Sequence, residues 1–219
     1  MLQGIDALNN LTNADEDEIA EEIRRWFEET PLPQDRVDKR VSLAIDLEKL
    51  FRNLFILMIT AEMIDELENK QSYFEDYAFS GYIGAMQDNG YDVDESSMGY
   101  IELYAKTRSK EIVDTAILRK ADAFYGSLQH TIAIGQDESS AVVNYEEQLQ
   151  AIASGYRFKS WVTMHDAKVR HTHRILDGKT IGIFQPFSVG KYQMMFPCDA
   201  SLGAGQKEIA NCRCFLEYS

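Results

Sequence analysis

Two pairs of side chains suited to metal binding lie near the C-terminus, His171-x-His173 and Cys212-x-Cys214. Imidazole nitrogens and thiolates are donors that Zn²⁺ prefers, and four of them usually close a structural zinc site in a small module. Alternate residues of a strand share one face, so each pair can converge on a single ion. These four residues are therefore the candidate ligands of a structural zinc.

Polar residues near the histidines support a second interpretation, in which no metal is bound. Asp166 and Arg170 are four residues apart, so on a helix they share a face, and His173 follows one turn later. These three side chains can form a buried network of ion pairs and hydrogen bonds. The cysteines then pack as small apolar residues. We favour this interpretation, and it predicts no cofactor.

The same residue types also fit a catalytic arrangement. Cys212 or Cys214 would be the nucleophile, with His173 as the base and Asp166 orienting it. No sequence feature indicates the cleft or the oxyanion donor that such a site needs. We therefore expect no enzyme activity, and a metal- or thiol-dependent hydrolase or nuclease is the alternative. A Cys198–Cys214 disulfide is a further alternative, which a reducing cytoplasm disfavours.

Three further features of this region have simple structural explanations. A lone Trp in a short strand usually belongs to the core, and we expect this of Trp161. Asp177-Gly178 is typical of a tight turn. Asn211 and Arg213, beside the cysteines, are expected to belong to the same structural network.

The motifs occur in a fixed order along the C-terminal third of the chain. They are Lys159-x-Trp161, then Asp166…Arg170…His173…Leu176-Asp177-Gly178, then Asn211-Cys212-Arg213-Cys214. This string, over about residues 141–219, resembles the C-terminal domain of the phage Mu F-like minor head proteins, also called the head morphogenesis family. The resemblance implies a structural minor capsid protein inside a bacteriophage head.

The resemblance also implies partners and a location. The partners would be the portal protein, a scaffold protein or the major capsid protein, with weak contact to packaged DNA and none to a membrane. The chain would lie in the virion, and in the host cytoplasm before assembly. Some members of the family carry Cys-x-x-Cys before Leu-Asp-Gly and a His three residues before Cys-Arg-Cys. Arg170 and Ile209 stand at two of these positions and cannot bind zinc.

Charge and composition predict an α+β protein in two parts. Residues 151–219 hold nine basic and five acidic side chains, a net charge of +4, whereas residues 1–150 carry −18. A net charge of +4 is too small to indicate a dedicated DNA-binding protein. We expect an acidic helical region over residues 1–155 and a small α+β module over 156–219. The longest apolar run, residues 54–61, is far too short to span a membrane.

The pattern of apolar and turn residues predicts individual elements. Residues 1–13 read as a loosely held leader, and a long helix is predicted from Asp35 to Lys70. A loop is predicted over residues 134–139, and a helix over about 163–174. Short strands are predicted at 160–164, 180–184, 192–196 and 215–218.

Overall fold

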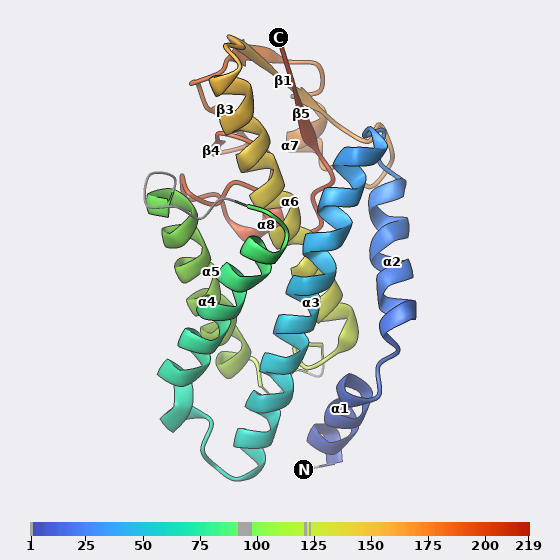
Figure 1. Cartoon of the computed structure of the whole chain (residues 1–219), viewed down its shortest axis with the longest axis vertical. Coiled ribbons are helices and arrows are strands. Elements are labelled where there is room, and N and C mark those ends of the chain that lie inside the picture. Colours follow the sequence, from blue (N-terminus) through green and yellow to red (C-terminus); the bar gives the residue numbers. More distant parts are fainter. Residues whose placement is uncertain (1, 92–97, 121, 123) are drawn as a thin grey trace. The chain divides into compact units, whose positions relative to one another are not determined.

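The computed structural model describes residues 2–91, 98–120, 122 and 124–219 (Figure 1). The predicted α+β class is confirmed, because helices occupy most of the chain up to Ala153 and short antiparallel strands follow. The helices are α1 (Leu2–Thr12), α2 (Glu16–Glu28), α3 (Gln34–Met63), the short 3₁₀ helix η1 (Glu68–Lys70), α4 (Gln71–Asp88), α5 (Met98–Leu118), α6 (Leu128–Ala153), α7 (His171–Arg174) and α8 (Gln206–Ile209). The strands are β1 (Phe158–Val162), β2 (Thr180–Gly182), β3 (Phe187–Val189), β4 (Tyr192–Met194) and β5 (Phe215–Tyr218).

The chain packs as two compact units whose boundaries fall inside helices. Unit 1 consists of residues 1–23 and 41–135, and unit 2 consists of residues 24–40 and 136–219. Helices α2, α3 and α6 therefore each contribute to both units. This division differs from the predicted boundary after residue 155, because parts of three helices pack with the C-terminal strands.

Apolar side chains of α3 form much of the core of unit 1. Leu47, Phe51 and Leu54 are all fully buried, as the spacing of apolar residues in this segment predicts. The helix ends at Met63, earlier than the predicted Lys70, and Asp65 takes the left-handed conformation (φ 59°) that follows it. The predicted leader is wrong, because α1 is helical and its Leu11 is fully buried.

The predicted loop over residues 134–139 is also wrong, because this stretch lies in the middle of α6. Its Gly135 and Ser139 both contact α3. A Cβ atom on Gly135 would lie 2.5 Å from the carbonyl oxygen of Ala44, so only glycine permits this approach to α3. Ser139 Oγ donates a 2.7 Å hydrogen bond to the Arg40 carbonyl oxygen.

The strands of unit 2 form a three-stranded antiparallel sheet in the order β2-β1-β5 and a separate β3-β4 pair. The central strand β1 alternates between buried and more exposed residues, which places Trp161 on the buried face. In Figure 1 the C-terminal half of α6 lies beside these strands. Two side chains of α6 bond to the strand region, Gln148 to Lys159 and Asn144 to the Pro197 carbonyl oxygen.

The predicted helix over residues 163–174 is reduced to its last turn, α7. The carboxylate of Asp166 accepts hydrogen bonds from the backbone N–H groups of Lys168 (2.8 Å) and Val169 (3.1 Å). Such a local side-chain turn competes with helical hydrogen bonding. The segment before α7 is therefore an irregular loop.

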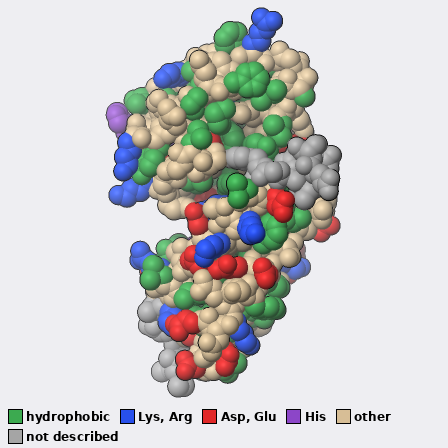
Figure 2. All heavy atoms as spheres, turned by 90° about the vertical axis from the view of Figure 1, so that its left-hand side faces the viewer, with side chains coloured by type: hydrophobic (Ala, Val, Ile, Leu, Met, Phe, Trp, Pro, Cys, Tyr) green, Lys and Arg blue, Asp and Glu red, His purple; other side chains and the backbone are tan. Residues whose placement is uncertain are grey.

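Within the described residues, no helix is both long and apolar enough to cross a lipid bilayer. Figure 2 shows hydrophobic side chains interspersed with charged and polar ones on one face of the molecule. Scattered exposed apolar residues of this kind are normal on protein surfaces.

Candidate metal-binding site

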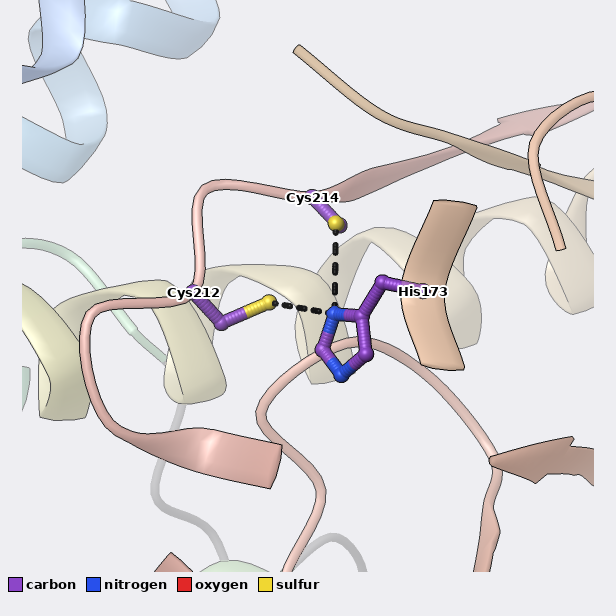
Figure 3. A group of neighbouring side chains, drawn as sticks. All are labelled: His173, Cys212 and Cys214. Atoms are coloured by element: carbon purple, nitrogen blue, oxygen red, sulfur yellow. Dashed lines mark hydrogen bonds between the residues drawn. The ribbon is translucent and has the colours of Figure 1, made fainter. Parts of the chain in front are cut away.

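Three residues that can hold a metal ion converge in unit 2 (Figure 3). His173 comes from α7, and Cys212 and Cys214 come from the segment between α8 and β5. The Nδ1 atom of His173 lies 3.5 Å from each of the two sulfur atoms. The exposed fractions are 1% for His173, 1% for Cys212 and 6% for Cys214.

His171, the fourth predicted ligand, is not part of this group. It is exposed, whereas His173 is buried. The zinc hypothesis required His171 and His173 to lie on an extended strand, where alternate residues share a face. They lie instead on the helical turn α7, and residues two apart on a helix face different sides. The sequence thus predicts all three clustered residues and adds one, His171, that the structure separates from them.

Two neighbours fix the orientation of the His173 ring. Trp161 packs edge-on against it, with 5.4 Å between the ring centroids. On the side away from the sulfurs, His173 Nε2 lies 3.3 Å from Glu208 Oε2, although this contact lacks hydrogen-bond geometry. Thr172 Oγ1 donates a 2.7 Å hydrogen bond to the same carboxylate oxygen. Glu208 is thus held close to Nε2 without a hydrogen bond to it.

The third cysteine, Cys198, is also buried and lies next to Cys212. Its sulfur is 3.6 Å from the Cys212 carbonyl oxygen, which it can approach as a weak donor. Hydrogen bonds from Cys198 and Cys214 lower the pKa of the Cys212 thiol well below its usual value, against the effect of burial. The hydrogen bond to Cys212, together with burial, raises the pKa of both Cys198 and Cys214. Of these three thiols, Cys212 is therefore the one whose thiolate form its neighbours favour.

The predicted network of Asp166, Arg170 and His173 is not formed. Asp166 pairs with Arg213, while Arg170 donates to the Ala210 carbonyl oxygen. The i, i+4 pairing of Asp166 with Arg170 required a helix that the loop does not form. Both arginine contacts nevertheless tie the loop before α7 to the segment that carries the cysteines.

Arg213 has a second carboxylate partner, and its neighbour Asn211 has a backbone role. Arg213 Nη1 lies 2.8 Å from Glu29 Oε2. Asn211 adopts a left-handed conformation (φ 55°), which Asn tolerates better than most residues, and its N–H donates to Asp137 Oδ1. Both residues thus hold the Cys-Arg-Cys segment in place.

Asp177 and Gly178 form the predicted turn, with Gly178 at φ 71°. The carboxylate of Asp177 also accepts hydrogen bonds from the N–H and Oγ1 of Thr163. Its other oxygen lies 2.7 Å from His165 Nε2. His165 was not among the predicted site residues, because a histidine at a left-handed position (φ 54°) in a loop carries no sequence signal.

The first residue of the Lys-x-Trp motif is a fully buried lysine. The Nζ atom of Lys159 donates to Gln148 Oε1 (2.9 Å) and to the Met195 carbonyl oxygen (2.7 Å). Burial lowers its pKa to about 8. Trp161 is fully buried, as expected for a core residue.

A pocket of about 370 Å³ reaches the three clustered residues. Its wall includes the basic side chains of Lys168, Arg170 and Arg213, and no carboxylate of the described residues lines it. Two of these have partners at its edge, since Arg213 pairs with Glu29 and Lys168 lies 3.8 Å from Glu29. The remaining lining residues are Trp26, Met164, Val169 and Asn211.

Comparisons with protein-family models, with curated proteins and with solved structures found no match to this chain.

Proposed function

We propose that this chain is a structural minor capsid protein of a bacteriophage head, which contacts the portal, scaffold or major capsid protein during assembly or DNA delivery. The proposal rests on the motifs that resemble the head morphogenesis family. Its main support is what those motif residues do in the fold. Their side chains hold the C-terminal module together through buried or partly buried bonds.

Each motif connects segments that are distant in sequence. Lys159 bonds to α6 and to the loop after β4, and Asp177 holds the start of the loop before α7. Arg213 joins that loop and the end of α2 to the cysteine segment. These residues serve the architecture of the module, which is compatible with a structural role.

The zinc hypothesis receives partial support. His173, Cys212 and Cys214 form a group that can hold a metal, whereas Arg170 and Ile209 occupy positions that are ligands in the family pattern. The Arg170 side chain donates a hydrogen bond to the carbonyl oxygen of Ala210, the residue that follows Ile209. In the family pattern a metal ion would connect the segment of Arg170 with the segment of Ile209. In this chain the hydrogen bond of Arg170 connects the same two segments.

One observation favours a second function, a metal- or thiol-dependent hydrolase or nuclease. Such an enzyme requires a pocket that contains His173 and a cysteine, and the 370 Å³ pocket satisfies this requirement. Against it, Asp166, which would orient the His173 base, pairs with Arg213 instead. We therefore retain the structural role as the main proposal.

Genetic complementation tests the proposal in the phage that encodes the chain. Deleting the gene should yield few or defective heads by electron microscopy, and the wild-type gene should restore them. A folded His173→Ala variant should also restore heads, because the structural role needs no catalysis. Normal heads without the gene would contradict the proposal. Loss of heads in His173→Ala with unchanged folding, together with a hydrolase activity of the wild type that the variant lacks, would favour the enzyme.

A further inference from the structure

The spacing of the three clustered donor atoms matches a tetrahedral metal centre. With zinc–sulfur bonds of about 2.3 Å and zinc–nitrogen bonds of about 2.1 Å, nitrogen and sulfur ligands lie about 3.6 Å apart. The two observed Nδ1–sulfur distances are both 3.5 Å. All three donor atoms lie within 4.8 Å of one another. A single ion can therefore contact all three with little movement.

Hydrogen bonding alone accounts poorly for this arrangement. Nδ1 of His173 is a single donor or a single acceptor, depending on the tautomer. It cannot make a full hydrogen bond to Cys212 and to Cys214 at once, yet both sulfurs point at it (Figure 3). A metal bound through Nδ1 satisfies all three atoms. It also places the ring proton on Nε2, which otherwise has no hydrogen bond and faces Glu208 at 3.3 Å. Carboxylates commonly orient metal-bound histidines in this way.

We propose that His173, Cys212 and Cys214 bind one zinc ion whose fourth position is taken by an exchangeable small anion or water from the adjoining pocket. Structural zinc sites use four protein ligands, whereas sites with three leave one position for an outside molecule. His171 cannot supply the fourth ligand, since it lies outside the group. Binding releases the thiol protons to solvent, because thiolates are the ligands.

The walls of the pocket indicate the class of the fourth ligand. Lys168, Arg170 and Arg213 line the pocket, and within the part of the chain that the structure describes no carboxylate does. Arg213 is already paired with Asp166 and Glu29. A zinc ion with two thiolates is formally neutral, so an anionic fourth ligand adds a negative charge that Arg170, which bonds to a backbone carbonyl oxygen, and more weakly the exposed Lys168 can stabilise. Small anions are therefore favoured over neutral or cationic molecules.

Cobalt substitution tests the site directly on the full-length, reduced protein. Co²⁺ should bind at one ion per chain and give the sulfur-to-cobalt and visible absorption bands of a tetrahedral centre. Adding azide should shift the visible bands, because azide takes the fourth position. Cys212→Ser and Cys214→Ser should each lose part of the sulfur-to-cobalt intensity. Failure to bind cobalt with this spectrum, or bands that azide leaves unchanged, overturns the proposal.

Matched variants separate the ligands from their neighbours. His171→Ala and Cys198→Ser should keep the cobalt spectrum and its azide response. If Cys198 closes the site, Cys198→Ser will change the spectrum and the wild type will not respond to azide, which contradicts an exchangeable position. Lys168→Gln should keep cobalt binding but raise the azide concentration at half-shift by about threefold, as expected for one exposed charge. Far-UV circular dichroism of each variant shows that the fold is retained.

Discussion

At the scale of single residues, Lys159 carries a pH dependence that can be measured. Burial lowers its pKa from 10.5 to about 8, whereas the unfolded chain has the higher value. Between pH 8 and 10.5 the unfolded state therefore binds more protons, and the contribution of Lys159 to the free energy of unfolding rises with pH, by up to about 3 kcal/mol. Lys159→Met should remove this rise in urea unfolding series across that range.

The matched control for this experiment is Lys179→Met, because Lys179 is exposed. It should keep the wild-type dependence of stability on pH. If the free energy of unfolding rises with pH as steeply in Lys159→Met as in the wild type, burial does not lower the pKa of Lys159.

Residue types predicted part of the candidate site and missed the rest. The types and spacing of His173, Cys212 and Cys214 indicated a metal or polar cluster, since few other residues can serve as soft ligands. The pairing of Asp166 with Arg213 could not be predicted, because it depends on a loop that a local carboxylate turn creates. Glu208, beside His173, was missed because α8 is a single turn without a periodic pattern.

At the scale of elements, a buried ion pair joins α3 and α6 within unit 2. Glu147 accepts hydrogen bonds from Arg36 (2.6 Å) and Arg40 (2.9 Å). These arginines lower the pKa of Glu147 from 4.5 to about 2, despite burial. Its stabilisation is complete above about pH 4.5 and is lost as the pH falls through about 2.

Glu147→Gln should therefore destabilise the protein by about 3 kcal/mol at pH 7 in chemical unfolding. The difference from the wild type should shrink as the pH falls below 4.5. The exposed Glu217→Gln variant is the control and should match the wild type throughout. A deficit that stays constant down to pH 2 would mean that the arginines do not hold the carboxylate as an ion pair.

The close approach of α6 to α3 in unit 1 gives a second prediction about elements. A Cβ atom on Gly135 would meet the Ala44 carbonyl oxygen at 2.5 Å and Glu48 at 3.1 Å. Gly135→Ala should lower the free energy of unfolding by about 1–3 kcal/mol, as overpacking does. Gly84→Ala, on α4 with nothing within 4 Å, should be neutral or stabilising by up to about 1 kcal/mol. Equal effects of the two would contradict the packing described.

Sequence patterns predicted the long helices and most strands, but not where polar helices continue. The apolar stripe of α3 and the alternation of β1 follow directly from burial on one face. Residues 134–139 looked like a loop because Gly and Ser favour turns. Their helical conformation depends on contacts with α3, which local sequence does not encode.

At the scale of the whole molecule, the negative charge belongs to one unit. Unit 1 has 8 basic and 23 acidic side chains, and unit 2 has 14 and 13. Residues 136–150 hold four acidic side chains and no basic one, and these offset the positive charge of residues 151–219. Unit 2 is nearly neutral, which argues against strong DNA binding. Unit 1 is suited to a basic protein surface, so we place the expected contacts with head proteins there.

Co-purification with the portal protein tests the central claim of a structural head component most directly. The tagged chain is co-expressed with the portal protein of the same phage and analysed by size-exclusion chromatography with light scattering. We expect a complex of defined mass that resists moderate salt and forms equally well with folded His173→Ala. Separate elution of the two proteins, together with a hydrolase activity that His173→Ala abolishes, would contradict the account.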